Sequence, residues 1–508
     1  MLVQTNLIGL GTLFVMRKNL LLVTCLGFIG ASLTFPAFGA VKAGAMCMKV
    51  GETKPSSSKN YLECREVAGG KLQYFLISNK PTPPPSNKSP ELLSVCRLPD
   101  ASTTGRPDGP SIAYPIPEGK LYTSIPRAGA IKEVIIPIDF SDSPGLTRPS
   151  SLYKPMMQNV DAWIKWYSHG KSHYEWQVVD QWIRAPLPSS EYVPADSKAP
   201  TNPDTPASFH TGRSISSTAI ATEVLNVAEK YFTYKGINSI YILYPPNVQN
   251  IWSGISKLGD FQMSNDPTLP AGTLQIKDDR LKGVWISASG YREYLYNFPQ
   301  WAFLLHENLH NQGLQGHAPN QGTPLGMMTN QYGKSMALNS WDSTIIDWQL
   351  PTDVYCVKKE NLKPTNIVMS PLEREEVGTK SIMIRLSATQ ALVIESRRRD
   401  RWSQGTNGYP GLPAGFYGLL VYKVDTTKSA QYGVAEQDGA AWQDKSDGFA
   451  YYLRNQNVSH GYLPGNQVNP PFDLNFVMYR GESLTTNGVK ISLVRSGDHD
   501  TVSIQKVD

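Results

Sequence analysis

The chain has 508 residues, enough for two or three domains, and 40% of them are hydrophobic, so a sizeable core can form. Its formal net charge of +5 is modest for this length and gives no reason to expect nucleic-acid binding. The 25 Tyr, 11 Trp, 38 Pro and 41 Gly residues favour a loop-rich, β-containing extracellular architecture over a helical bundle.

The N-terminal 45 residues are typical of an export signal. Met16-Arg17-Lys18 forms a basic start, residues 19–35 are largely apolar, and small residues follow over 37–45. We therefore expect a signal peptide over 1–45, with Met16 as an alternative start. Cleavage would leave a secreted or cell-surface chain with no stable membrane span; the alternative is an uncleaved anchor.

Residues 46–78 are predicted to form a small N-terminal module closed by a Cys47–Cys64 disulfide, because these two cysteines bracket one short segment. Cys96 and Cys356 form the pair left by elimination, although spacing alone does not decide the connectivity. Residues 79–128 are rich in Pro and Gly, which predicts a linker or pro-segment.

From residue 129 the pattern alternates between strands and helices, which predicts a catalytic domain over 129–350. We expect strands at 134–140, 239–244 and 284–287, and helices at 161–166 and 216–232.

Residues 306–313 read His-Glu-Asn-Leu-His-Asn-Gln-Gly and contain the most informative functional motif of the sequence. The apolar run 301–305, preceded by Pro299, predicts a buried helix that starts near this proline. On a helix His306 and His310 share one face, with Glu307 beside the first. H-E-x-x-H is typical of zinc hydrolases, in which the Glu is the general base. The alternative is a buried helix whose histidines are only hydrogen-bonded.

A catalytic zinc needs three protein ligands and one open position. Gly313 is predicted to end the helix in the left-handed region, so the chain turns back and offers His317 as the third ligand. Asn320 is a poorer candidate. A Glu ligand from a second helix is disfavoured, because the next Glu after Glu307 is Glu360.

A second helix is predicted over 335–350, with Leu338, Trp341, Ile345 and Trp348 as its core stripe. Strands dominate beyond 351, at 381–386, 391–395, 418–424, 489–494 and 501–507, which predicts a C-terminal β domain over 351–508. We interpret the basic run Arg397-Arg398-Arg399 as a solvated loop face, with binding of an acidic cell-surface polymer as the alternative.

Gly313, His317 and then Leu325-Gly326-Met327-Met328 resemble the metzincin clan, in which a Met-containing turn passes under the metal. The chain departs from the common spacing by one residue, because Gly316 occupies the usual third-ligand position. Over residues 130–430 the chain resembles the immune inhibitor A type of secreted metallopeptidase. The matching segments are 131–142, 166–179, 338–348, 392–397 and 418–425. That family has an acidic third ligand, so this chain is a divergent member.

The resemblance implies an α+β fold, with a metzincin-like zinc-peptidase domain followed by a β-sandwich-like domain. It implies a secreted zinc endopeptidase that acts on protein or peptide substrates and is expected to be a monomer. His306, His310 and His317 would bind Zn²⁺, and Glu307 would be the general base. Met327 or Met328 would form the apolar floor, and Tyr332 is the candidate for contacting the tetrahedral intermediate. The family also implies Ca²⁺, although no D-x-D-x-D-G loop occurs.

Two other functions fit the same sequence. One is a cell-surface or adhesive binding protein on a catalytically silent peptidase scaffold, which the retained Glu307 and three histidines disfavour. The other is a zinc hydrolase of a non-peptide substrate, such as a glycan or an ester, because specificity pockets carry no short motif.

Overall fold

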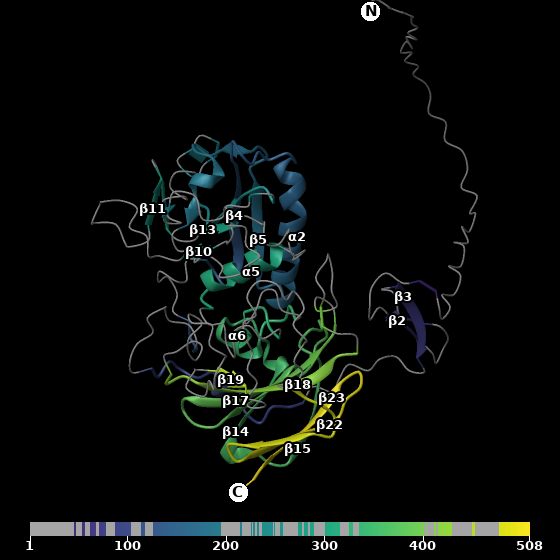
Figure 1. Cartoon of the computed structure of the whole chain (residues 1–508). Helices are drawn as coiled ribbons and strands as arrows, with labels where there is room; N and C mark the ends of the chain where they lie inside the picture. Colours follow the sequence, from purple (N-terminus) through teal and green to yellow (C-terminus); the bar gives the residue numbers. More distant parts are fainter. Residues whose placement is uncertain are drawn as a thin grey trace, which may run out of the picture. The chain divides into compact units, whose positions relative to one another are not determined.

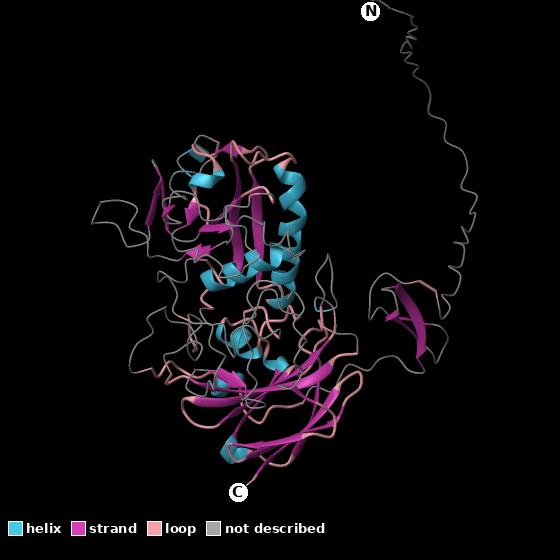
Figure 2. Cartoon of the chain, in the orientation of Figure 1, coloured by secondary structure: helices cyan, strands magenta, loops and turns pink. Residues whose placement is uncertain are grey.

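The chain divides into two compact units, Met1–Lys80 and Pro81–Asp508, in a computed structural model. Its described parts mix helices and sheets, which confirms the predicted mixture of α and β structure (Figure 2). The structure describes residues 45–46, 53–55, 61–67, 71–77, 87–102, 113–116, 125–194, 214–215, 225, 227–228, 231–232, 236–246, 248, 255–257, 273–276, 279–282, 285–288, 300–314, 325–328, 335–400, 403, 411–412, 415–428, 450–452 and 477–507.

The first unit holds one antiparallel sheet in the order β1-β2-β3, formed by Thr53–Pro55, Tyr61–Val67 and Lys71–Ile77. Leu62 and Tyr74 are buried on it. The predicted export signal and the side chains of Cys47 and Cys64 lie outside what the structure describes, so the expected pairing stays a prediction.

The second unit begins with a sheet in the order β10-β13-β9-β4-β5 (Figure 1). Its strands are Ile255–Lys257, Trp285–Ala288, Ser239–Leu243, Gly129–Asp139 and Ser172–Val178, in that order. The last four run parallel to their neighbours, and β10 pairs antiparallel with β13 at the edge. The three strands expected between residues 129 and 298 are thereby confirmed.

Helices α2 (Pro149–Tyr167) and α5 (Gln300–Asn311) pack on one face of this sheet. Alternate residues of a strand point to opposite faces, so Ile131 and Ile135 of β4 meet these helices, whereas Val134 and Ile136 face away. We call the cluster on the helix side the central cluster; it also includes Trp163, Trp301 and Leu305.

Helix α2 is three times as long as the predicted helix at 161–166, so that prediction is wrong in length. Pro149 stands in the first turn, where its missing N–H is not needed, and Pro155 lies inside the helix. The burial of one apolar face, including Met157 and Val160, stabilises a helix that two prolines made difficult to predict. In the predicted helix 216–232, the described residues 225, 227 and 228 are helical.

Two sheets follow. One has the order β14-β16-β17-β18-β19, with β20 also paired to β18; the other has the order β15-β23-β22-β21 (Figure 1). The first contains Val354–Lys358, Ser381–Arg385, Gln390–Arg398, Tyr417–Asp425, Ala450–Tyr452 and Val477–Met478, and the second contains Thr365–Met369, Asp500–Lys506, Val489–Arg495 and Ser483–Thr486. All five strands expected beyond residue 351 are confirmed.

Strand β17 is buried on both faces. Ala391 and Val393 belong to the central cluster, whereas Leu392 and Ile394 belong to a second cluster shared with β15, β22 and β23. The odd-numbered residues of β17 therefore face the α/β part of the unit, and the even-numbered residues face the other sheet.

The predicted helix 335–350 is wrong at both ends, because helix α6 covers only Ser340–Ile345. Its late start has a clear cause: Ser335 pairs with Leu325 in a β-bridge, and the Met327 N–H donates to the Ala337 carbonyl at 2.9 Å. This pairing keeps residues 335–339 out of the helix. Trp341, Ile345 and Trp348 are buried as the predicted core stripe requires.

The shorter elements connect these layers. They are α1 (Leu93–Cys96), β6 (Ile183–Arg184), β7 (Val193–Pro194), β8 (Ser214–Ile215), β11 (Thr273–Ile276), β12 (Asp279–Lys282) and the 3₁₀ turns Ser189–Glu191, Pro351–Asp353 and Lys359–Asn361.

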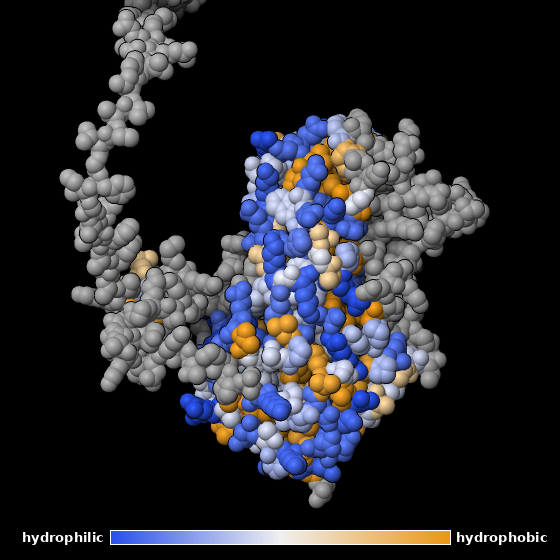
Figure 3. Space-filling model, turned by 180° about the vertical axis from the view of Figure 1, so that it is seen from behind, coloured by the Kyte–Doolittle hydropathy of each residue, from blue (hydrophilic) through white to orange (hydrophobic). Residues whose placement is uncertain are grey.

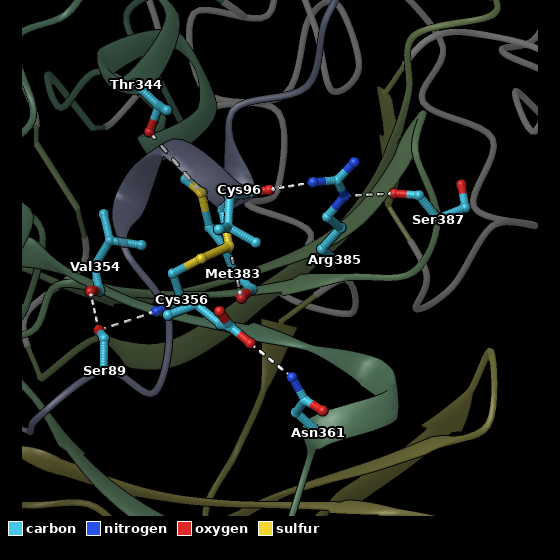
Figure 4. Close-up of a disulfide and its surroundings, with 11 residues drawn as sticks. Ser89, Cys96, Thr344, Val354, Cys356, Asn361, Met383, Arg385 and Ser387 are labelled. Atoms are coloured by element: carbon cyan, nitrogen blue, oxygen red, sulfur yellow. Dashed lines mark hydrogen bonds between the residues drawn. A yellow bond between two sulfur atoms is a disulfide. The ribbon is translucent and has the colours of Figure 1, made fainter.

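A disulfide joins Cys96 of α1 to Cys356 of β14, the pair left by elimination in the sequence (Figure 4). Beside it, the Ser89 hydroxyl donates to the Val354 carbonyl and accepts from the Cys356 N–H, at 2.8 and 3.1 Å. Arg385 donates to the Val95 carbonyl at 3.0 Å. Residues 87–98 are therefore held against the first of the two C-terminal sheets.

The described surface in Figure 3 is mostly hydrophilic, with smaller hydrophobic areas between. Among the described helices, none is long and apolar enough to cross a membrane.

Candidate metal site

Helix α5 carries the H-E-x-x-H residues, and it begins at Gln300, directly after Pro299, as predicted. At its other end the Gly313 N–H donates to the His310 carbonyl at 2.9 Å, and the Leu314 N–H donates to the Leu309 carbonyl at 3.0 Å. These two bonds form a Schellman motif, which places Gly313 in the left-handed region with φ of +111°. The predicted role of Gly313 at the helix end is confirmed.

The two histidine rings meet on one face of the helix. Nε2 of His306 lies 3.1 Å from Nε2 of His310, and the ring planes stand at 90° to each other. Two nitrogens bound to one tetrahedral zinc, each at about 2.0–2.1 Å, lie about 3.3 Å apart. The observed separation fits two ligands of one such ion.

Both rings are oriented through their other nitrogen. His306 Nδ1 lies 2.8 Å from the Met327 carbonyl, and His310 Nδ1 lies 2.6 Å from the Leu314 carbonyl. A carbonyl only accepts, so each Nδ1 carries the proton and each neutral ring has its lone pair on Nε2. Backbone carbonyls commonly orient metal-binding histidines in this way.

Two lone pairs this close repel each other unless a proton or a cation lies between them. A shared proton requires one ring to be protonated, but burial lowers the pKa of His310 to about 4, against a small opposing effect of its bond to Leu314. Near neutral pH the His310 ring is therefore neutral in the metal-free chain, with its Nε2 lone pair facing His306.

The turn under the helix comes from residues 325–328, in which Met327 and Met328 are fully buried. The Met327 carbonyl meets His306, and its N–H is bonded to Ala337. The structure thus places the predicted Met-containing turn against the first histidine. Glu307 is half-buried, one residue beyond His306.

Three of the predicted site residues lie outside the described residues: His317, the alternative ligand Asn320, and Tyr332. Within the described ranges no group of three or more His, Cys, Asp or Glu side chains is arranged to hold a metal. The described residues thus fit a zinc ion with two of the three proposed ligands.

Sequence reasoning missed one group beside this site. Arg397, expected on a solvated loop, has 0% of its side chain exposed and lies in β17 among Glu395, Glu373 and Asn339. That expectation is wrong for Arg397. The available signal was strand periodicity: Arg397 lies an even number of residues after Ala391 and Val393, so it points to the same buried face of the strand.

No protein-family model matches this chain, and no curated protein matches it.

Proposed function

We propose that this chain is an exported zinc-dependent endopeptidase, a divergent relative of the immune inhibitor A type of metallopeptidase. The observation that carries the proposal is the pair of Nε2 atoms of His306 and His310, 3.1 Å apart, with both Nδ1 atoms directed to backbone carbonyls. This arrangement prepares two neutral imidazoles for one cation.

His306, His310 and His317 are the proposed ligands of the zinc ion. When bound, zinc supplies a Lewis acid that polarises a carbonyl and lowers the pKa of a water ligand to about 7. Glu307 follows a ligand on the same helix, so its carboxylate is suited to accept a proton from the attacking water and deliver it to the leaving amine. Met327 or Met328 would form the apolar floor, and Tyr332 would contact the tetrahedral intermediate.

We interpret residues 129–350 as a metzincin-like catalytic domain and residues 351–508 as a β-sandwich-like domain. Support comes from the helices packed on one face of a mixed sheet, and from the apolar cluster that the two C-terminal sheets share. We further propose a protein or peptide substrate, a monomer and, from the family resemblance alone, a structural Ca²⁺.

The test combines zinc content with cleavage of casein by the purified mature protein. His306→Ala and His310→Ala should each lose most of the zinc, and His173→Ala is the matched control because that ring is 41% exposed on β5. Glu307→Gln should retain zinc and lose about 10²–10⁴-fold in rate, because it cannot accept the proton. A chelator should abolish cleavage by the wild type.

Two outcomes would redirect the assignment. Zinc retained at full stoichiometry in both histidine variants would remove the metal site from α5. A zinc-loaded wild type that cleaves no peptide in a broad library would favour the binding-protein function or a non-peptide substrate.

A further inference from the structure

Arg397 is a fully buried cation with two fully buried carboxylates as partners. Its Nε donates to Glu395 Oε2 at 2.9 Å, and its Nη1 lies 3.4 Å from Glu373 Oε1. Burial raises the pKa of Glu373, and the Arg397 charge opposes that rise. A buried ion-pair cluster often adds little net stability compared with apolar residues of the same volume. Another role is therefore needed to explain this group.

The rest of the guanidinium reaches the Met-containing turn at Leu325 and the segment 335–339 that pairs with it. Nη2 donates to Asn339 Oδ1 at 2.6 Å and lies 3.5 Å from the Leu325 carbonyl, and Nη1 donates to the Ser335 hydroxyl at 3.2 Å. Leu325 and Ser335 are themselves joined by a β-bridge. The planar side chain of Arg397 thus contacts both segments. Its several N–H donors point in fixed directions toward these acceptors, whereas the ammonium of a Lys could not reach all of them.

The same two segments position the first histidine. Met327 lies two residues after Leu325, its N–H is bonded to Ala337, and its carbonyl accepts from His306 Nδ1. Arg397 is therefore connected to the His306 ring by a short series of hydrogen bonds between buried groups.

Glu395 extends the contact to the next helix. Its Oε1 accepts from the Ser340 N–H at 2.6 Å, at the start of α6, and from the Tyr422 hydroxyl at 2.7 Å. The Tyr422 hydroxyl also accepts from the Trp341 N–H at 3.1 Å. Strands β17 and β18 therefore hold both the turn and the helix that follows it.

We propose that Arg397 is a positioning residue for the metal site. Through Arg397 the C-terminal sheet holds the segments 325–328 and 335–340 in place, and these segments orient His306 toward His310. This inference rests on the proposed function. It makes the C-terminal β-structure part of the metal site rather than an appended module.

The test compares Arg397→Lys with Arg398→Lys in the full chain. Both variants keep the positive charge, but Arg398 points to the other face of β17, where its Nη2 donates to Asp500 Oδ1 at 2.7 Å. Loss of a group that orients a metal ligand typically weakens metal affinity about 10–100-fold. We expect that loss of zinc affinity, measured by chelator competition, in Arg397→Lys and not in Arg398→Lys. The d–d absorption of the cobalt-loaded protein, which reports ligand geometry, should change in the same variant only.

A second variant covers the case in which Arg397→Lys fails to fold. Asn339→Ala removes the 2.6 Å acceptor on the turn side and leaves both ion pairs in place, so it should weaken zinc binding in the same direction. If zinc affinity and the cobalt spectrum are unchanged in every folded variant, Arg397 does not position the metal site.

Hydrogen exchange at the Met327 amide tests, in the absence of metal, whether Arg397 holds the Met-containing turn in place. That amide should exchange faster in metal-free Arg397→Lys than in metal-free Arg398→Lys, and equal rates would overturn the inference. A wild type that binds no zinc would instead overturn the proposed function, so the two failures are distinguishable.

Discussion

Glu133 is a carboxylic acid in the interior of β4, with 1% of its surface exposed. It lies on the face of the sheet that packs against α2 and α5, directly opposite Ser239 of β9 and diagonal to Tyr241 of the same strand. Burial raises the pKa of Glu133 well above its usual value, and the hydroxyls of Tyr241 and Ser239 lower it by less. Burial therefore favours the neutral acid form of Glu133 in the folded chain.

This shift predicts a pH dependence of stability. Between the ordinary carboxyl pKa and the raised folded pKa, the folded state binds more protons than the unfolded state. The contribution of Glu133 is thus fully present below pH 4.5 and is lost as the pH rises through the folded pKa. Glu133→Gln should remove this slope and raise the free energy of unfolding at pH 8, as measured by urea denaturation at pH 5 and pH 8. An identical slope in the wild type and the variant would show that Glu133 ionises freely.

At the scale of elements, the end of α5 fixes the orientation of the His310 ring. The Schellman turn at Gly313 brings the Leu314 carbonyl back to His310 Nδ1 at 2.6 Å. The same turn therefore ends the helix and orients the His310 ring toward His306.

The disulfide between α1 and β14 joins residues 260 positions apart in the chain. Closing so long a loop removes conformational entropy from the unfolded state, an effect of typically about 2–5 kcal/mol. Cys96→Ala with Cys356→Ala should lower the free energy of unfolding by about that amount, measured by guanidinium denaturation with urea as a check. Reduction of the wild type should reproduce the loss. A double variant as stable as the oxidised wild type would show that the hydrogen bonds of Ser89 and Arg385 hold residues 87–98 alone.

At the scale of the whole molecule, the central cluster is shared between the layers of the second unit. The central cluster extends from Leu98 through α2, α5 and α6 to Leu420 and Val477. The α/β layer and the first C-terminal sheet therefore share buried apolar surface, which is the main source of cooperativity in folding.

We expect this unit to unfold in a single transition. A chain lacking residues 1–80 should show one calorimetric peak with equal calorimetric and van't Hoff enthalpies, and it should bind as much zinc as the longer chain. The first unit has its own sheet and its own internal contacts, so its removal should shift that peak little. Two resolved peaks from the shorter chain would mean that residues 129–350 and 351–508 unfold independently.

Local patterns in the sequence predicted a large part of this structure. The strands at 239–244, 381–386 and 489–494 and the helix that carries His306 and His310 follow from residue periodicity, from Pro299 before the helix and from Gly313 after it. These signals act between residues a few positions apart, so no knowledge of the remaining chain is needed to read them. The i, i+4 spacing likewise sufficed to place the two Nε2 atoms on one face.

Tertiary structure alone decided the rest. Residues 335–339 have a helical pattern, yet they are not helical. Ser335 pairs with Leu325 and the Ala337 carbonyl accepts from the Met327 N–H, so these backbone bonds replace those of a helix. Arg397 reads as part of an exposed basic run, yet it is buried against the Leu325 carbonyl, 72 positions away in the chain. The physical reason is the same in both cases. A contact between distant segments forms only when packing brings them together, and once formed it outweighs a local preference worth less than about 1 kcal/mol per residue.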